Sequence, residues 1–215
     1  MVGSRLRRKA RRRRVVLSTV HQGHDRRVAL LCGAGYLLTG LVAGRHEGKW
    51  EAASMKGLNH LGKIPALRVP QQLGTPWVLP GIAAVAFVRD RPHLATAAAL
   101  ALPVEKASEV GIKMLVRRRR PAQSPRPARL RDDAPADGPS YPSGHAAIAF
   151  AATTLLAPYV NLPIVALVGA GGVVVGLRRV QQGAHFPLDS VGGALLGVMV
   201  GSGLTWAMGR PISEA

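Results

Sequence analysis

The feature that most constrains this chain is a series of long apolar segments with few charged residues. Six such segments can be marked: Val28–Gly44, Pro76–Val88, Leu94–Val116, His145–Val160, Leu162–Leu177 and Val191–Met208. A soluble bundle would show clear polar faces at helical spacing, but the first and the last two segments carry no charge at all. A helix that spans a bilayer needs about 20 mostly apolar residues. The pattern therefore predicts an all-α, polytopic membrane bundle of about six transmembrane helices, of which Pro76–Val88 is clearly short.

Composition agrees with this fold class and limits the possible partners. Aromatic residues make up only 4% of the chain, so the apolar content is mostly small, as in closely packed membrane helices. The single cysteine, Cys32, excludes an intrachain disulfide and argues against a thiolate metal site. The formal charge of +18 is compatible with nucleic acid, an anionic membrane or an anionic substrate. The charge lies in one tail and at segment edges, and no nucleic-acid motif is present, so no nucleic-acid partner is expected.

The basic residues also suggest a division of the chain. We expect a basic cytoplasmic tail at residues 1–27, a membrane domain at 28–208 with its motif-bearing core at 94–208, and a short tail at 209–215. A cleaved signal peptide is the alternative for the first apolar segment. The stretch LTGLVAGRHEG has no convincing small-x-small cleavage site, which favours a retained helix.

Orientation follows from the positive-inside rule, which keeps the basic tail cytoplasmic. Six crossings then place the short turn Arg89–His93 inside, and the loops Arg45–Thr75, Arg117–Tyr141 and Arg178–Ser190 outside. The middle outer loop is very basic, from RRRRP through RPARLR, and so breaks the rule. An anion-binding role on the extracytoplasmic face would explain the exception. The stretch WEAASMKGLNHLGKI in the first outer loop fits either an interfacial helix that guides lipid headgroups or a plain loop helix.

Three polar clusters fall at this same membrane face: KMLVRRRRP, YPSGH and GLRRVQQGAHFPLDS. In the second, Ser143 is a favourable N-cap for the following apolar helix, whose free N–H groups attract an anion. Gly144 allows a phosphate to approach the backbone, and His145 could donate a proton to it. The alternative is an ordinary capped helix with a surface histidine.

The third cluster supplies a candidate nucleophile. Pro187 suits the first turn of a helix, which puts His185 in the loop before that helix and Asp189 within its first turn. A carboxylate bonded to one ring nitrogen leaves the other nitrogen free to attack, and Arg179 could bind phosphate oxygens. The alternative is an interfacial His–Asp pair with arginines that reach towards lipid headgroups.

Together the clusters provide what phosphoryl transfer requires, namely cations, a nucleophile and an acid. A histidine nucleophile needs no metal-activated water, and the sequence has no dense carboxylate cluster for magnesium. We therefore expect metal-independent, cofactor-free chemistry through a phosphohistidine.

At these residues the chain resembles the type 2 phosphatidic acid phosphatase superfamily, which also includes vanadium haloperoxidases. The family pattern is K-x6-R-P, then P-S-G-H, then S-R-x5-H-x3-D. Here it corresponds to Lys113 with Arg120-Pro121, to Pro142–His145, and to Arg179, His185 and Asp189, with every spacing intact. The resemblance covers roughly residues 94–208 and implies a fold of six helices. One position departs from it, because Arg178 stands where the family has serine.

The resemblance implies that His185 attacks phosphorus, that Asp189 orients it and that His145 protonates the leaving oxygen. It also implies a set of phosphate-binding residues: Lys113, Arg120, Ser143, Gly144 and Arg179. The expected protein is a multi-pass cell-membrane lipid phosphatase that acts on a polyprenyl phosphate or diphosphate or on a phospholipid phosphate. A phosphotransferase that uses the same phosphohistidine is the main alternative, and a non-catalytic membrane protein or transporter is a more distant one.

Overall fold

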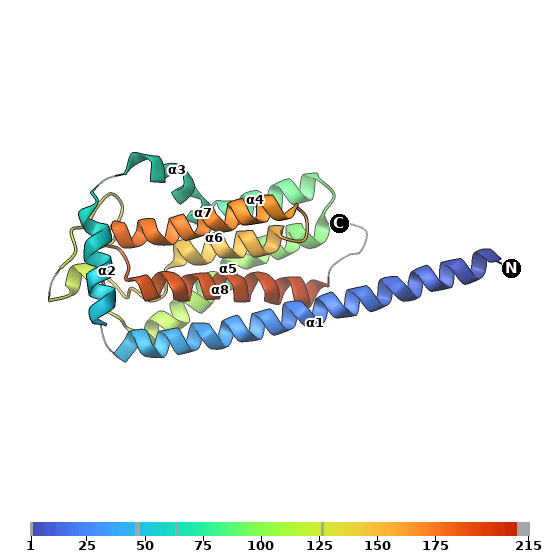
Figure 1. The fold of residues 1–215 in the computed structure, drawn as a ribbon, viewed down its shortest axis with the longest axis horizontal. Coiled ribbons are helices and arrows are strands. Elements are labelled where there is room, and N and C mark those ends of the chain that lie inside the picture. Colours follow the sequence, from blue (N-terminus) through green and yellow to red (C-terminus); the bar gives the residue numbers. More distant parts are fainter. Residues whose placement is uncertain (1, 46–47, 63, 126, 210–215) are drawn as a thin grey trace.

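The computed structural model describes residues 2–45, 48–62, 64–125 and 127–209, and within them the chain is entirely helical, without strands (Figure 1). Its α-helices are α1 (Val2–Arg45), α2 (Lys49–His60), α3 (Arg68–Gln71), α4 (Val78–Val88), α5 (Pro92–Val116), α6 (Gly144–Leu156), α7 (Leu162–Gln181) and α8 (Pro187–Met208). Short 3-10 turns occupy Pro65–Leu67, Gln72–Gly74 and Pro121–Gln123. The prediction of an all-α membrane bundle is confirmed.

Among the residues that the structure describes, three helical stretches are long and apolar enough to cross a bilayer: Gly23–Arg45 within α1, α7 and α8. Helices α4 and α6 are apolar but shorter, and the count of six crossings stays a prediction. Large apolar side chains point outward from the long helices, as Leu31 of α1 and Leu167 of α7 show, each 73% exposed. So much exposed apolar surface is unfavourable in water and suits contact with lipid tails.

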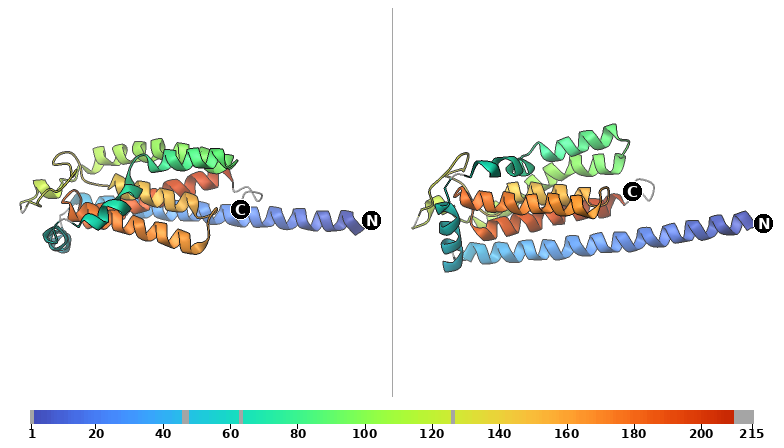
Figure 2. Two further views of the ribbon diagram at one scale, coloured as in Figure 1. Left: turned by 90° about the horizontal axis from the view of Figure 1, so that it is seen from above. Right: turned by 45° about the horizontal axis from the view of Figure 1, so that its top comes forward.

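Helix α8 lies between α6 and the carboxyl-terminal half of α1 (Figure 2). Glycines let α8 approach α6 closely, as small residues do between membrane helices. A Cβ atom at Gly193 would lie 2.2 Å from the carbonyl oxygen of Ser143, and one at Gly197 would lie 2.2 Å from that of Ala147. This seam fixes the start of α8 against the start of α6.

Tyr141 secures the segment that enters α6. Its buried ring stacks on Tyr36 of α1, with 5.9 Å between ring centroids, and its hydroxyl shares a 2.7 Å hydrogen bond with Thr39. Gly192 of α8 faces the same ring, where a Cβ atom would come within 2.3 Å. The polar segment before α6 is thereby held by two apolar helices.

The connections sort to opposite ends of the bundle (Figure 1). Helices α2 and α3, the segment between α5 and α6, and the α7–α8 turn gather at one end. The α4–α5 turn and the carboxyl end of α8 lie at the other. All three polar clusters therefore meet at a single end of the bundle. There the close packing of α6 on α8 holds the starts of these two helices together.

Candidate active site

The centre of this end is the turn between α7 and α8. Gly183 has a φ of 77°, and a Cβ atom there would lie 3.0 Å from the Arg129 carbonyl oxygen, so the tight turn favours glycine. Two residues later His185 is only 3% exposed, and its Nδ1 is 3.6 Å from Asp189 Oδ2. The same Asp189 oxygen accepts a 2.8 Å hydrogen bond from the Phe186 N–H. The carboxylate is therefore fixed beside Nδ1, which leaves Nε2 as the ring nitrogen turned away from it.

The surroundings of His185 favour its neutral form. Burial, together with the nearby cations Arg120 and Arg179, lowers the pKa of His185 to about 4, because Asp189 opposes these effects only in part. A neutral imidazole has a free lone pair at pH 7, as a nucleophile requires. His145, at the start of α6 and half-buried, lies within electrostatic range of both His185 and Arg179.

Arg120 and Arg179 flank His185 from two elements. Arg120 is buried and donates 2.8 Å hydrogen bonds to the carbonyl oxygens of Asp137 and Ala184, the latter being the residue before His185. Arg179 is also buried and donates to Gln182 Oε1 at 2.9 Å. Its Nε has no hydrogen-bond partner in the described part of the chain. Both guanidinium groups therefore lie near His185 and can donate hydrogen bonds to an anion.

The start of α6 forms another wall. The Ser143 N–H donates a 2.8 Å hydrogen bond to the Asp189 carbonyl oxygen, which ties the starts of α6 and α8 together. Ser143 is the N-cap residue as predicted, but its hydroxyl makes no cap hydrogen bond. Its Oγ is buried and has no partner within the described residues. That hydroxyl is an uncommitted polar group next to the helix N-terminus.

Lys113 joins this wall through a carboxylate that the sequence patterns did not single out. Its Nζ is 2.5 Å from Glu109 Oε1, and Lys106 binds the other oxygen of the same carboxylate. Both Glu109 oxygens lie 2.8 Å from where a Cβ atom of Gly144 would stand. The glycine therefore makes room for the Lys106–Glu109–Lys113 group against α6.

Two further residues were missed, and they support Asp189. Arg118 is buried and spans two carboxylates, at 2.7 Å from Asp189 Oδ1 and 2.6 Å from Glu51 Oε2. Its guanidinium also lies over the Phe186 ring, 4.5 Å from the centroid. Glu51 in turn accepts a 3.1 Å hydrogen bond from the Leu188 N–H. The order Glu51, Arg118, Asp189, His185 thus forms a continuous chain of contacts.

This chain of contacts gives α2 a structural role. Glu51, Met55 and Asn59 are its buried residues, and the helix packs on α7 and α8. Whether α2 also meets lipid headgroups stays a prediction. No spacing in the sequence separates Arg118 from its neighbours in the arginine run, and only the position of Glu51 on the inner face of an amphipathic helix offered a signal.

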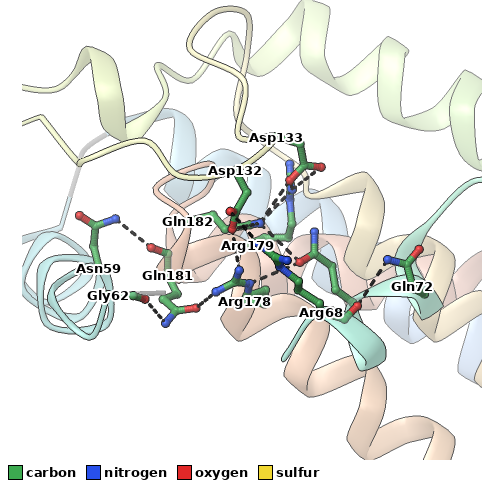
Figure 3. Close-up of polar contacts among 11 residues, drawn as sticks. Asn59, Gly62, Arg68, Gln72, Asp132, Asp133, Arg178, Arg179, Gln181 and Gln182 are labelled. Carbon is green, nitrogen blue, oxygen red and sulfur yellow. Dashed lines mark hydrogen bonds and ion pairs between the residues drawn. The ribbon is translucent and has the colours of Figure 1, made fainter. Parts of the chain in front are cut away.

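Arg178, at the family's serine position, is 1% exposed and bonded to protein groups (Figure 3). Its guanidinium contacts Asp132 Oδ2 at 2.6 Å and Gln71 Oε1 at 3.3 Å, and it also bonds Gln181. The neighbouring Asp133 lies 3.3 Å from Arg179. Arg178 therefore anchors the segment after the arginine run onto α7 and α3.

Eight residues were predicted from the sequence to form the site, and the structure brings them to one end of the bundle. They are Lys113, Arg120, Ser143, Gly144, His145, Arg179, His185 and Asp189. The arrangement offers a buried neutral imidazole, a second histidine, cationic donors and a helix N-terminus around one place. These groups can bind and transfer a phosphoryl group.

Comparison with known proteins supports this interpretation. Residues 78–212 match the model of the PAP2 superfamily. A decaprenylphosphoryl-5-phosphoribose phosphatase of Mycobacterium tuberculosis is 35% identical over 153 residues, which cover 70% of this chain and 76% of the relative.

Two solved structures are similar. The crystal structure of Aquifex aeolicus LpxE has a TM-score of 0.60 and 27% sequence identity, and the match covers 68% of this chain and 89% of the LpxE chain. A PAP2-type phosphatidylglycerolphosphate phosphatase from Bacillus subtilis has a TM-score of 0.45 and 21% identity, over 87% of this chain and 94% of its own.

Proposed function

The chain belongs to the PAP2 superfamily and is a membrane lipid phosphatase, and from this premise we propose that it works through a phosphohistidine at His185, without a metal ion. The observation that carries the proposal is a buried His185 whose Nδ1 faces Asp189 and which lies within electrostatic range of Arg120 and Arg179. A neutral nucleophile surrounded by cations is suited to attack an anionic phosphate.

In the first step, His185 Nε2 attacks phosphorus and the bond from phosphorus to the lipid oxygen breaks. Arg120 and Arg179 stabilise the charge on the phosphoryl oxygens, and the helix N-terminus at Ser143 adds backbone donors. His145 gives a proton to the leaving oxygen, so that the lipid departs as an alcohol or, from a diphosphate, as a monophosphate. Burial, Arg179 and His185 lower the pKa of His145 to about 4, and the negative charge of a bound phosphate raises that pKa so that His145 can carry the proton. Asp189 stabilises the positive charge that appears on His185.

In the second step, a water molecule attacks phosphorus from the side that the lipid has left. His145, now neutral, accepts a proton from this water, and the bond between phosphorus and Nε2 breaks. Inorganic phosphate leaves, and both histidines return to their starting protonation states. The same two residues therefore serve both halves of the cycle.

For the substrate, we propose a polyprenyl lipid that carries a terminal phosphate or diphosphate. The support is the similarity to a relative named for a decaprenylphosphoryl sugar phosphate, together with a site at the end of a lipid-exposed bundle. Phospholipid phosphates are the alternative class.

The test is phosphate release by the purified protein in detergent, with EDTA present, from a polyprenyl diphosphate, a polyprenyl phosphate sugar phosphate and phosphatidic acid. We expect release in EDTA that is lost in His185→Ala and kept in His60→Ala, a control at an exposed histidine of α2. Trapping of labelled phosphate on the wild-type protein in acid-quenched reactions should depend on His185. Activity that requires an added metal, or that survives in His185→Ala, would refute the mechanism.

We also propose that the site faces the extracytoplasmic side, on the charge argument of the positive-inside rule. A cysteine placed at exposed Lys56 of α2, in a Cys32→Ala background, should react with a membrane-impermeant maleimide added to intact cells. A cysteine at exposed Arg89, in the turn at the opposite end, should react only after the cells are opened. The reverse labelling pattern would invert the orientation.

A further inference from the structure

A groove lies between α4, α5 and the end of α6, far from the active site. It has a volume of about 510 Å³, and its walls are mainly apolar side chains of α4 and α6, including Ile82, Val85 and Leu156. Helix α5 begins beside the groove at Pro92 and ends near Lys113 after 25 residues, about 37 Å. The groove and the phosphatase site are therefore at opposite ends of the bundle, as the α4–α5 turn in Figure 1 shows.

Two arginines stand at the mouth of this apolar groove. Arg89 is exposed, and Arg91 is half-buried with its guanidinium 5.9 Å from the centre of the Tyr159 ring. Arg91 Nη1 is buried and has no hydrogen-bond partner among the described residues. A buried donor without a partner is unfavourable, so an oxygen-rich anion at this point would satisfy a group that the protein leaves open.

We propose that this groove binds one anionic phospholipid from the leaflet opposite the active site. Its phosphate would bind Arg89 and Arg91, and an acyl chain would lie along the apolar wall of α4. Guanidinium groups bind phosphate oxygens with directed hydrogen bonds, and basic groups at the membrane surface attract anionic lipids. A soluble phosphate would use the arginines but not the apolar wall, which is why the groove favours a lipid.

Gly81 offers a way to test the apolar part separately. It lines the groove from the first half of α4, and a Cβ atom there would meet nothing within 4 Å. Leucine at this position would therefore extend into the groove rather than into the protein, and it has a higher helix propensity than glycine. Gly81→Leu should fill the chain-binding wall without loss of folding.

The experiment measures lipid binding to the full-length protein in neutral detergent, by native mass spectrometry and by the shift in unfolding temperature. The probes are phosphatidylglycerol, phosphatidylcholine and glycerol phosphate. We expect one phosphatidylglycerol to bind at least about tenfold more tightly than phosphatidylcholine, because the quaternary ammonium of phosphatidylcholine cancels its phosphate charge and is repelled by the two arginines. The preference should disappear in the double variant Arg89→Gln, Arg91→Gln, and binding of both lipids should weaken in Gly81→Leu.

The control is Arg27→Gln, which removes an exposed charge outside the groove. Arg27 lies at the same end of the bundle, since its neighbour Arg26 lies over Trp206 near the end of α8. It should bind phosphatidylglycerol as the wild type does. Equal binding of both lipids by the wild type, or loss of preference in Arg27→Gln, would overturn the proposal in favour of general surface charge. Unchanged binding in Gly81→Leu, or full competition by glycerol phosphate, would overturn the lipid assignment in favour of a soluble-anion site. Phosphatase activity that persists in all variants would show that each one folds.

Discussion

Removal of the Arg118 charge should raise the pH at which the enzyme loses activity in acid. One oxygen of the Asp189 carboxylate lies 2.7 Å from the Arg118 guanidinium, and the other lies 3.6 Å from His185 Nδ1. The guanidinium and the imidazole ring are therefore separated by the width of a carboxylate and two contacts, roughly 8 Å. At an effective dielectric constant of about 20, two positive charges at that separation repel by about 2 kcal/mol, or about 1.5 pKa units. The pKa of His185, lowered to about 4 by burial, should therefore rise to roughly 5.5 in Arg118→Met.

The assay is the pH dependence of kcat/KM, which reports the pKa of the free enzyme. Because the attacking imidazole must be neutral, activity is present above the pKa of His185 and is lost as the pH falls through it. Arg118→Met should shift this acid limb upward. Glu51→Gln should shift it slightly downward, since a negative charge is removed on the far side of Arg118 while the amide oxygen can still accept from the Leu188 N–H. Arg119→Met, at an exposed position of the same run, is the matched control.

The opposite signs separate an electrostatic role from a merely structural one. Arg118→Met should also lower stability by about 3–5 kcal/mol, because it leaves two buried carboxylates without their shared cation. A loss of stability alone would lower the amount of active enzyme at every pH and would not move the limb. If the acid limbs of Arg118→Met, Glu51→Gln and Arg119→Met lie at the same pH, Arg118 and Glu51 do not act on the pKa of His185 and the reasoning is wrong.

Three further outcomes follow from the geometry. In the wild type, kcat/KM should fall tenfold per pH unit once the pH drops below about 4, and a limb near 6.5, the ordinary pKa of histidine, would contradict the effect of burial. Gly197→Leu should lower the free energy of unfolding by about 1–3 kcal/mol, and with it the unfolding temperature, because its Cβ would clash with the Ala147 carbonyl oxygen. Gly57→Leu, in open space on α2, should leave the unfolding temperature unchanged. Gly144→Ala should displace Glu109 and lower kcat about tenfold to a hundredfold with little change in unfolding temperature; unchanged kcat would show that the Glu109 position is unimportant.

Much of the fold follows from the sequence because its strongest signals are local. The apolar runs predict α4 to α8 to within a few residues, since each run ends at a proline, a glycine or a charged turn. Pro187 at the start of α8 and Arg179 at the end of α7 are placed by helix-terminus rules alone. The spacing of the three motifs then predicts which residues meet, because spacing along a helix determines the face on which a side chain lies.

The parts that could not be predicted depend on contacts between distant segments. Glu51 lies 67 residues from Arg118 in the chain, and the hydrogen bond between them exists only because α2 folds back onto α8. Gly144 is required because Glu109 of α5 approaches it, and no local pattern contains that information. Similarly, the sequence shows only that Arg178 stands where the family has serine, and its contacts with Asp132 and Gln71 are needed to reveal its use as an anchor.

The arginines of the site divide by the partners that the fold gives them. Arg118 and Arg178 are each held by a carboxylate at 2.7 Å or less, so their charge is already balanced within the protein. Arg120 donates to carbonyl oxygens, and the Asp133 that faces Arg179 is 60% exposed and 3.3 Å away.

Balanced buried charges hold a structure in place, whereas charges with only neutral or loose partners are available to a ligand. A phosphate dianion that enters next to His185 therefore meets two available guanidinium groups, and these are the two arginines that stand at the motif positions. The arginine run contains both a balanced arginine, Arg118, and an available one, Arg120. The sequence shows that both are charged, but only their neighbours in the fold determine whether that charge is already balanced.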